Sequence, residues 1–361
     1  MKEYRKSNYL DFLRIFATIA VVSIHVSATK WSQADVFGIE WKTYNIFDSI
    51  SRWAVPAFLM ISGALFLQRD AISIKNIYSK YIGRLCCAYL FWSVFYYLFS
   101  GKSSVIDRVG ALFKPGKTDK LISIINGKYH MWFIPMIIGI YMCLPIIKQI
   151  VSNKKVMDYF LIISFAFSFL FPQIVYLVRD FGNENLVKLV NAISSFKDAL
   201  YLQIIVNFVF YFILGYRLSI LDLSRVKRVI IYLVGMGSFL FTAIITDVVS
   251  TNNGKAISTY YGNMTVNVLL EAVSLFVLFK YIGFDIKSDK INKFFVLVSK
   301  WSFGAYLVHI YVLEKMNHLH MLSFVEAPYV KVPFTILIVF VISIAISAIC
   351  NCIPIVKKYI V

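Results

Sequence analysis

The stretch YLDFLRIFATIAVVSIHVSAT, residues 9–29, is apolar along most of its length and is long enough to cross a lipid bilayer as a helix. It nevertheless contains three ionisable residues, Asp11, Arg14 and His25. Such residues are costly inside a membrane span, and they usually face the protein interior and have a function. We therefore expect this helix to line a polar cavity whose walls are formed by the other spans.

The spacing of these residues places them on one face. The eleven steps from Arg14 to His25 correspond to about three helical turns, so the two side chains share a face and lie roughly 16 Å apart along the axis. Asp11 lies one turn before Arg14, and Thr18 lies one turn after it, so the four residues form one stripe. Two simpler interpretations stay open. Asp11 and Arg14 pair only with each other near the membrane interface, or His25 is a hydrogen-bonded polar residue near the outer boundary.

The composition is that of an integral membrane protein. Hydrophobic residues make up 59% of the 361 residues, whereas soluble domains are nearer to about 45–50%. A net charge of +18 would suggest a nucleic-acid partner in a soluble protein. Here the Lys and Arg residues lie mostly between apolar runs, so membrane topology explains them better and we expect no nucleic-acid partner. The five cysteines lack metal-ligand spacing, and we expect no metal site.

Ten apolar runs predict an all-α, polytopic bundle of about ten transmembrane helices. They lie near residues 9–29, 45–67, 83–100, 131–150, 158–178, 200–217, 229–249, 263–282, 302–315 and 332–352. Lys and Arg residues are more numerous on the side of the termini, which predicts a multi-pass protein of the cell membrane with both termini cytoplasmic. We expect residues 1–361 to form a single transmembrane domain. The longest outer loop, 101–128, is predicted to hold a short amphipathic helix.

The second apolar run carries a further arginine, Arg52, four residues before Pro56. Pro56 removes a backbone hydrogen bond and is expected to kink this helix. A buried arginine needs a partner, and Asp48, one turn earlier, is the simplest candidate. Glu271, two turns into the eighth run, is another intramembrane carboxylate that is able to pair with a buried arginine.

Several motifs together resemble a known family. Arg14 and His25 form an Arg-x10-His pattern, which is followed by VPAFLMISGALF at 55–66, HMWFIPMIIGIYMCLPII at 130–147, FYFILGYRL at 210–218 and SFGAYLVHI at 302–310. Their order and spacing, over nearly the whole chain, are similar to those of the membrane-bound acyltransferase 3 family, which includes bacterial O-acetyltransferases of cell-surface polysaccharides. The resemblance implies about ten helices, a cytosolic acyl-CoA donor such as acetyl-CoA, and a glycan acceptor that is reached from the outer face.

The residues of the stripe suit this chemistry. Acyl transfer to a hydroxyl group needs a base for the alcohol proton and a donor that stabilises the oxyanion. His25 is the candidate base, because histidine titrates near neutral pH; an acetyl-histidine intermediate and direct attack both stay open. Arg14, towards the cytosolic leaflet, suits the phosphates of coenzyme A. Arg52, towards the outer side, is a candidate for polarising the acyl carbonyl.

A basic segment follows the second span. The resemblance implies that an arginine-rich segment at this place contacts the donor, and this chain matches it in part with Arg69, Lys80 and Arg84. The tendency of Lys and Arg to keep a loop on the cytoplasmic side of the membrane explains the same charges equally well.

Three further residues are candidates for binding the acceptor. His130 and Trp132 lie at the outer mouth of the fourth span, where a boundary between membrane and water is the simpler explanation. His309 shares a face with Ser302 and Tyr306, and it either orients substrate or bonds a neighbouring helix.

A transporter or flippase of a polar or lipid-linked substrate is the alternative function. Intramembrane charges and proline-broken helices are also typical of transporters. Against this alternative, the sequence shows no matched pair of broken helices in two halves, so we favour an acyltransferase that modifies a cell-surface glycan.

Overall fold

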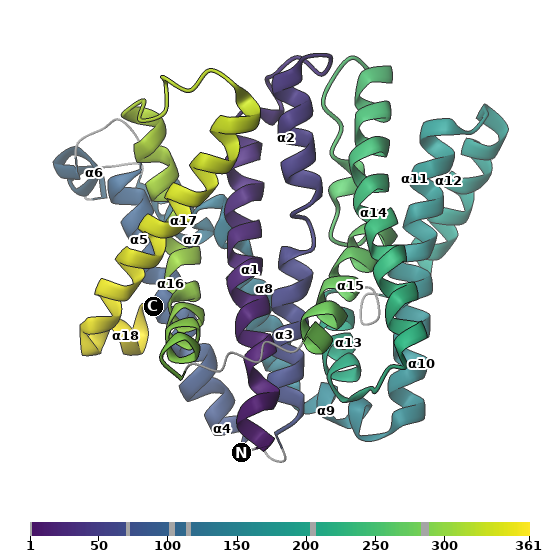
Figure 1. The fold of residues 1–361 in the computed structure, drawn as a ribbon, viewed down its shortest axis with the longest axis horizontal. Helices are drawn as coiled ribbons and strands as arrows, with labels where there is room; N and C mark the ends of the chain where they lie inside the picture. The colour runs from purple at the N-terminus through teal and green to yellow at the C-terminus, as the bar shows by residue number, and fades with distance from the viewer. Residues whose placement is uncertain (1, 70–72, 101–104, 113–116, 203–206, 283–288) are drawn as a thin grey trace.

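The structure is a computed structural model that describes residues 2–69, 73–100, 105–112, 117–202, 207–282 and 289–361. Within these ranges the regular structure is helical, without strands, and Figure 1 shows most helices standing side by side as a bundle. The elements are α1 (Lys2–Trp31), α2 (Ile39–Ser49), α3 (Ala54–Leu67), α4 (Ile74–Asn76), η1 (Ile77–Ile82), α5 (Gly83–Phe99), α6 (Val105–Leu112), α7 (Lys117–Asn126), η2 (Tyr129–Trp132), α8 (Phe133–Met142), α9 (Leu144–Ser152), α10 (Lys154–Phe165), η3 (Ala166–Leu170), α11 (Phe171–Phe181), α12 (Glu184–Ala199), α13 (Val209–Ile220), α14 (Arg225–Asn252), η4 (Thr259–Tyr261), α15 (Val266–Ile282), α16 (Asp289–His318), α17 (Pro328–Cys352) and α18 (Pro354–Tyr359).

The polytopic, all-α class is confirmed. In the described part of the chain, eight helical segments are long and apolar enough to cross a membrane, and a bent pair, Thr118–Asn126 with Tyr129–Met142, makes nine if it counts as one span. The sequence predicts ten, and the difference lies at 200–217. There the structure describes α13, whose 12 residues are too few to cross a hydrocarbon core of about 30 Å. Residues 203–206 of that run lie outside the described residues.

Helix α1 holds the centre of the bundle (Figure 1) and packs against α2, α3, α15, α16 and α17. Its apolar residues are buried on several sides; Leu13 and Ala17, for example, are fully buried. Phe12 packs against Phe295 of α16, with ring centroids 4.6 Å apart. A helix that is apolar around most of its circumference is expected to be enclosed in this way.

The predicted second span is broken rather than kinked at its proline. Helices α2 and α3 are separated by a turn at residues 50–53, and Pro56 lies in the first turn of α3. The first N–H groups of a helix have no partner within it, so the proline costs no hydrogen bond at this position. The indole of Trp53 donates to the carbonyl of Ile50 at 2.9 Å, which satisfies one backbone group that the break leaves free. The break sets Arg52 between the two helices.

A second break between helices lies at the start of the predicted fourth span. Helix α7 and the η2–α8 segment meet at an angle of 62° around Gly127, which has a φ of +64°. A positive φ favours glycine, so the bend falls where the sequence permits it. His130 and Trp132 lie on η2, directly after this bend. The amphipathic helix predicted for 101–128 corresponds to the short helices α6 and α7.

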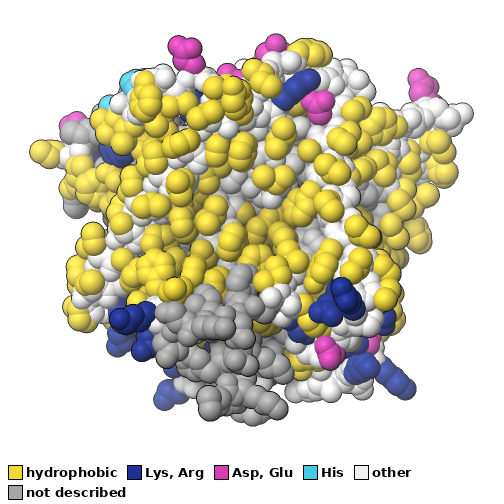
Figure 2. Space-filling view, viewed as in Figure 1, with side chains coloured by type: hydrophobic (Ala, Val, Ile, Leu, Met, Phe, Trp, Pro, Cys, Tyr) yellow, Lys and Arg dark blue, Asp and Glu magenta, His cyan; other side chains and the backbone are white. Residues whose placement is uncertain are grey.

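The surface has the polarity of a membrane protein. The face shown in Figure 2 has a broad hydrophobic band, with Lys and Arg gathered mostly towards the lower edge and Asp and Glu mostly towards the upper edge. Both ends of the chain lie in the lower half of the same view in Figure 1. Helix α1 begins at the more basic edge, and the C-terminal end lies just below mid-height, nearer to that edge than to the opposite one.

Helices α3 and α13 approach each other at two glycines. A Cβ atom on Gly63 would lie 1.7 Å from the carbonyl oxygen of Phe212, and one on Gly215 would lie 2.1 Å from that of Met60. Small residues allow such backbone contact between membrane helices. The contact anchors the short helix α13 against α3, which is a wall of the site described below.

This contact predicts that replacing different glycines by alanine changes the stability of the protein to different extents. Gly63→Ala and Gly215→Ala should each lower the apparent melting temperature in detergent, because overpacking typically costs about 1–3 kcal/mol and here the clash is with backbone. Gly237→Ala is the matched control, since a Cβ there meets no atom within 4 Å. Equal melting temperatures for all three variants would show that the close contact is absent in solution.

Candidate active site

A cavity of about 330 Å³ runs beside α1 inside the bundle, and its wall includes both Arg14 and His25. Helix α3, the turn before it, α5, the η2–α8 segment and α16 supply the other walls. Apolar and aromatic residues make up much of the lining, and the polar groups are few. Of the stripe on the first span, Arg14 and His25 line this cavity, whereas Asp11 and Thr18 do not, and the wall is mostly apolar rather than polar. The cavity resembles typical small-molecule sites, which are mostly apolar with a few placed polar groups.

Arg14 is both paired and open to the cavity. Its Nη1 donates to Ser299 Oγ of α16 at 3.0 Å and lies 3.4 Å from Asp11 Oδ1. Ser299 Oγ in turn donates to Asp11 Oδ1 at 2.6 Å. The pairing with Asp11 that the sequence left open is therefore present, and Arg14 remains on the wall beside it. Thr18, the fourth member of the stripe, instead donates to the backbone carbonyl of Arg14.

His25 meets two other histidines. The ring centroid of His309 lies 5.1 Å from that of His25 and 5.1 Å from that of His130, and His25 and His130 are 6.2 Å apart. The three rings come from α1, η2 and α16, and the bend at Gly127 directs the η2 ring inward. His25 and His130 line the cavity, whereas His309 lies behind them and is fully buried. Within the described ranges, no cluster of His, Cys, Asp and Glu has an arrangement that could hold a metal ion.

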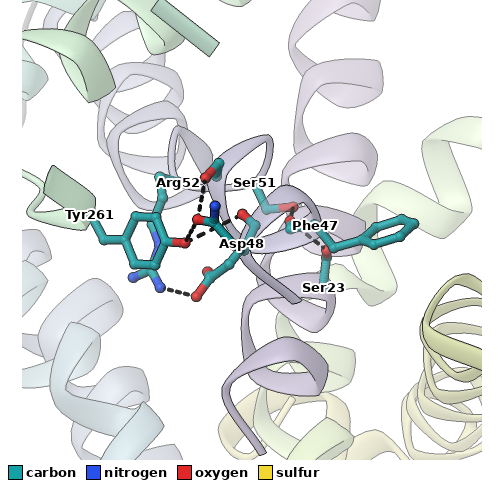
Figure 3. Close-up of polar contacts among 8 residues, drawn as sticks. Ser23, Phe47, Asp48, Ser51, Arg52 and Tyr261 are labelled. Carbon is teal, nitrogen blue, oxygen red and sulfur yellow. Dashed lines mark hydrogen bonds and ion pairs between the residues drawn. The ribbon is translucent and has the colours of Figure 1, made fainter. Parts of the chain in front are cut away.

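Arg52 is held by two neighbours at the same cavity. It forms an ion pair with Asp48, as the sequence predicts, and its guanidinium carbon lies 4.1 Å from the centre of the Tyr261 ring. Figure 3 shows Arg52 between the carboxylate of Asp48 and the ring of Tyr261. The Nε atom of Arg52 is buried and has no hydrogen-bond partner in the described structure. Arg52 therefore retains a donor while its charge is neutralised, which is how a buried arginine is tolerated in a membrane.

Glu271, which the sequence offers as a candidate partner for a buried arginine, forms no direct ion pair with one among the described residues, although Arg52 lies close enough to interact with it electrostatically. Its carboxylate accepts a hydrogen bond from Thr242 of α14 at 2.5 Å, and Asn267 donates to the same threonine hydroxyl at 2.8 Å. Helices α14 and α15 pack against each other, which brings the hydroxyl of Thr242 to this carboxylate.

The predicted donor-binding residues differ in their relation to the cavity. Arg69 stacks on Phe66, with its guanidinium carbon 4.6 Å from the ring centre, and Phe66 packs against Tyr141 of the cavity wall, with centroids 4.7 Å apart. Arg84 donates to the backbone carbonyl of Val361 and lies 6.0 Å from the ring centre of Phe303, another wall residue. Both arginines thus lie one aromatic layer outside the cavity.

Lys80 is exposed on η1 and does not line the cavity. The sequence could not separate it from the two arginines, because the irregular turn at η1 decides which way each side chain of this segment points.

Trp132 lines the cavity while 42% of its surface remains exposed. Its ring packs against Phe208, with centroids 5.6 Å apart. It is therefore an aromatic residue at the edge of the cavity rather than a lipid-facing anchor alone.

Sequence reasoning missed several wall residues. Asn263 comes from the segment between η4 and α15, and nothing in its local sequence marks it. Tyr141 belongs to an apolar run in which a tyrosine is unremarkable. Ser302 and Tyr306 share a helical face with His309, and this spacing is the sequence signal that identifies them as candidates for the wall.

The fold and the cavity define an integral membrane protein with an internal site that suits a group-transfer reaction. A protein-family model described as an acyltransferase domain matches residues 7–352, nearly the whole chain. The chain belongs to the acyltransferase 3 family, so it is a membrane acyltransferase that uses an acyl donor and an acceptor. No curated protein and no solved structure matches it significantly. Family membership favours acyl transfer over the transporter alternative.

Proposed function

We propose that this protein transfers an acetyl group from cytosolic acetyl-CoA to a hydroxyl group of a bacterial cell-surface glycan on the outer side of the cell membrane. The observation that carries the proposal is the single cavity shared by Arg14 and His25, which lie roughly 16 Å apart along α1. An anion-binding group and a base at two depths of one cavity suit a donor and an acceptor that approach from opposite sides.

The size of the cavity limits which part of the donor enters it. About 330 Å³ is near the lower end of the range of about 300–1,000 Å³ for ligand sites. It suits the narrow arm and acyl group of acetyl-CoA and excludes its nucleotide. The nucleotide phosphates then remain at the end of the cavity nearer the chain termini, where Arg14 lies on the wall and Arg69 and Arg84 lie one aromatic layer outside it, since arginine suits phosphate. Lys80 stays a candidate only for an outlying contact.

The chemical step is assigned to the other end of the cavity, where His25 and Arg52 lie. His25 accepts the proton of the acceptor hydroxyl while that oxygen attacks the acyl carbon. The free Nε–H of Arg52 stabilises the oxyanion, and Asp48 and Tyr261 hold the guanidinium in place. When the carbon–sulfur bond breaks, His25 returns the proton to the thiolate, so no net proton is produced. Trp132 and His130 line the cavity and contact the acceptor, and an exposed aromatic face suits a sugar ring. His309 lies behind this wall, so it orients the acceptor only through its neighbours.

This proposal places both termini in the cytoplasm. The support is that α1 begins at the more basic edge and that the C-terminal end lies nearer to that edge than to the opposite one. Tags at either terminus should therefore be protected from an impermeant reagent in intact cells and become labelled after permeabilisation. A cysteine placed in the loop between α1 and α2, at Ser32→Cys, is the matched control and should be labelled from outside. The reverse pattern would contradict the donor geometry.

Replacing His25 tests the base. His25→Ala in nanodiscs should lower kcat for acetyl transfer to a panel of methyl glycosides by about 10²–10⁴-fold, the usual contribution of a general base. Binding of acetyl-CoA should change little, because the residue acts on the acceptor proton. His318→Ala removes an exposed histidine at the end of α16 and should retain full activity. If His25→Ala is fully active, His25 is not the base.

Replacing Arg14 and replacing Arg52 should change different kinetic constants. Arg14→Ala should raise the KM for acetyl-CoA by about tenfold or more, because a charged hydrogen bond contributes about 1.5–3 kcal/mol. Arg52→Gln should instead lower kcat and leave that KM nearly unchanged, since an oxyanion exists only in the transition state. Steady-state kinetics with donor and acceptor varied separately measure both effects.

Two further variants separate donor binding by Arg14 from a structural role. Arg14→Lys should recover only part of the affinity, because it keeps the charge and loses the planar fork. If Arg14 serves only to neutralise Asp11, the double variant Asp11→Asn with Arg14→Gln should recover most of the activity. That recovery, or an unchanged KM in Arg14→Ala, would remove Arg14 from the donor site.

A further inference from the structure

The buried ring of His309 has one nitrogen fixed and one free. Its Nδ1 lies 2.6 Å from the backbone carbonyl oxygen of Tyr306. A carbonyl oxygen only accepts hydrogen bonds, so Nδ1 carries the proton, and in the neutral ring Nε2 carries the lone pair. That Nε2 atom is buried without a hydrogen-bond partner in the described structure. Buried polar atoms are rarely left unpaired, so this nitrogen calls for an explanation.

The surroundings of His309 limit what its Nε2 can bind. The nearest rings are those of His25 and His130, each 5.1 Å away, and Tyr306 at 6.0 Å. No ion pair joins the three histidines to a carboxylate in the described ranges. At these distances, one bridging water or a small rotation of a ring connects two imidazole nitrogens.

The third histidine, His130, has no ring nitrogen that is fixed in the way that Nδ1 of His309 is fixed. Both of its ring nitrogens are buried, and neither has a hydrogen bond of good geometry in the described structure, although the backbone of Leu307 lies near the ring. Its backbone carbonyl is held instead, by the hydroxyl of Tyr306 at 2.6 Å. Tyr306 therefore fixes the ring of His309 and only the backbone of His130.

We propose that His309 is the positioning residue of His25: its Nε2 accepts a hydrogen bond from one ring nitrogen of His25, directly or through one water, and leaves the other nitrogen free as the base that faces the cavity. The proposal rests on the function proposed above. In this role His309 orients the ring of His25, whereas the sequence suggested that His309 orients substrate or bonds a neighbouring helix.

The consequence for the reaction is a defined path for one proton. The cavity-facing nitrogen of His25 takes the hydroxyl proton as the carbon–oxygen bond forms, and the resulting imidazolium keeps its second N–H bonded to His309. The same proton then passes to the sulfur as the carbon–sulfur bond breaks. A neutral imidazole stabilises this cation without placing an additional negative charge inside the membrane, where an unpaired carboxylate would be costly.

Two replacements of His309 separate positioning from packing. His309→Phe keeps a planar ring and removes the acceptor. His309→Gln keeps an amide that is able to donate to the Tyr306 carbonyl and to accept from His25. His309→Phe should lower kcat for acetyl transfer from acetyl-CoA to methyl glycosides by about 10–100-fold with both KM values unchanged, and His309→Gln should recover most of it. This loss is smaller than the ~10⁴-fold loss seen when the carboxylate partner of a triad histidine is neutralised.

A chemical readout makes the test independent of the acyltransferase assignment. Diethyl pyrocarbonate transfers an ethoxycarbonyl group to a free imidazole nitrogen, and mass spectrometry of the nanodisc-embedded protein follows modification of His25. The rate should fall in His309→Phe and recover in His309→Gln, while the melting temperatures stay close to that of the wild type.

The outcomes are distinguishable. Equal ethoxycarbonylation rates of His25 in all three proteins would overturn the positioning role, and so would a loss that appears in KM rather than in kcat. Equal loss in the Phe and Gln variants would also overturn it. Full activity of His25→Ala would defeat the proposed base, whereas a rate of His25 modification that depends on His309 would still support the pairing of the two rings.

Discussion

The structure depends on neutralising charge at the centre of a membrane bundle. Arg14 lies in the middle of α1, and a guanidinium there is tolerated only because Asp11 and Ser299 bind it. Ser299 comes from α16, so this pairing fixes the position of α16 against α1 as well as the charge. Asp48 and Tyr261 do the same for Arg52, and they connect the turn after α2 to the segment before α15. The two neutralised arginines thus hold the helices that enclose the cavity.

Sequence alone predicts the helical class, the central first span and the Asp48–Arg52 pair, because hydropathy and helical spacing are local properties. The placement of α13 was not predictable. Its 12 residues are anchored by Gly63 and Gly215 against α3, and a contact between backbones distant in sequence leaves no signal in the hydropathy of either run. The sequence predicts a kink at Pro56, whereas the helix is broken at residues 50–53, because a proline marks the start of a helix as readily as a kink.

The residues of the candidate site also fall into those that the sequence predicts and those that it does not. Arg14, His25 and Arg52 were identifiable because an ionisable residue in an apolar run is conspicuous. The meeting of His25, His130 and His309 was not, since it depends on the bend at Gly127 and on the packing of α16 beside α1. The hydrogen bond between Thr242 and Glu271 was likewise not predictable, because which polar group a helix meets depends on its neighbour in the fold.

The one cavity that connects Arg14 to His25 has an energetic consequence for the proposed reaction. If only an acyl group of a few atoms passes from one leaflet to the other, neither the nucleotide nor the glycan crosses the bilayer. The thioester bond that is broken then supplies the free energy for export as well as for ester formation. Such an enzyme needs no ion gradient and no alternation between inward-open and outward-open states. Each acyl group delivered outside corresponds to one thiol released inside, so synthesis and vectorial transport have a fixed one-to-one stoichiometry.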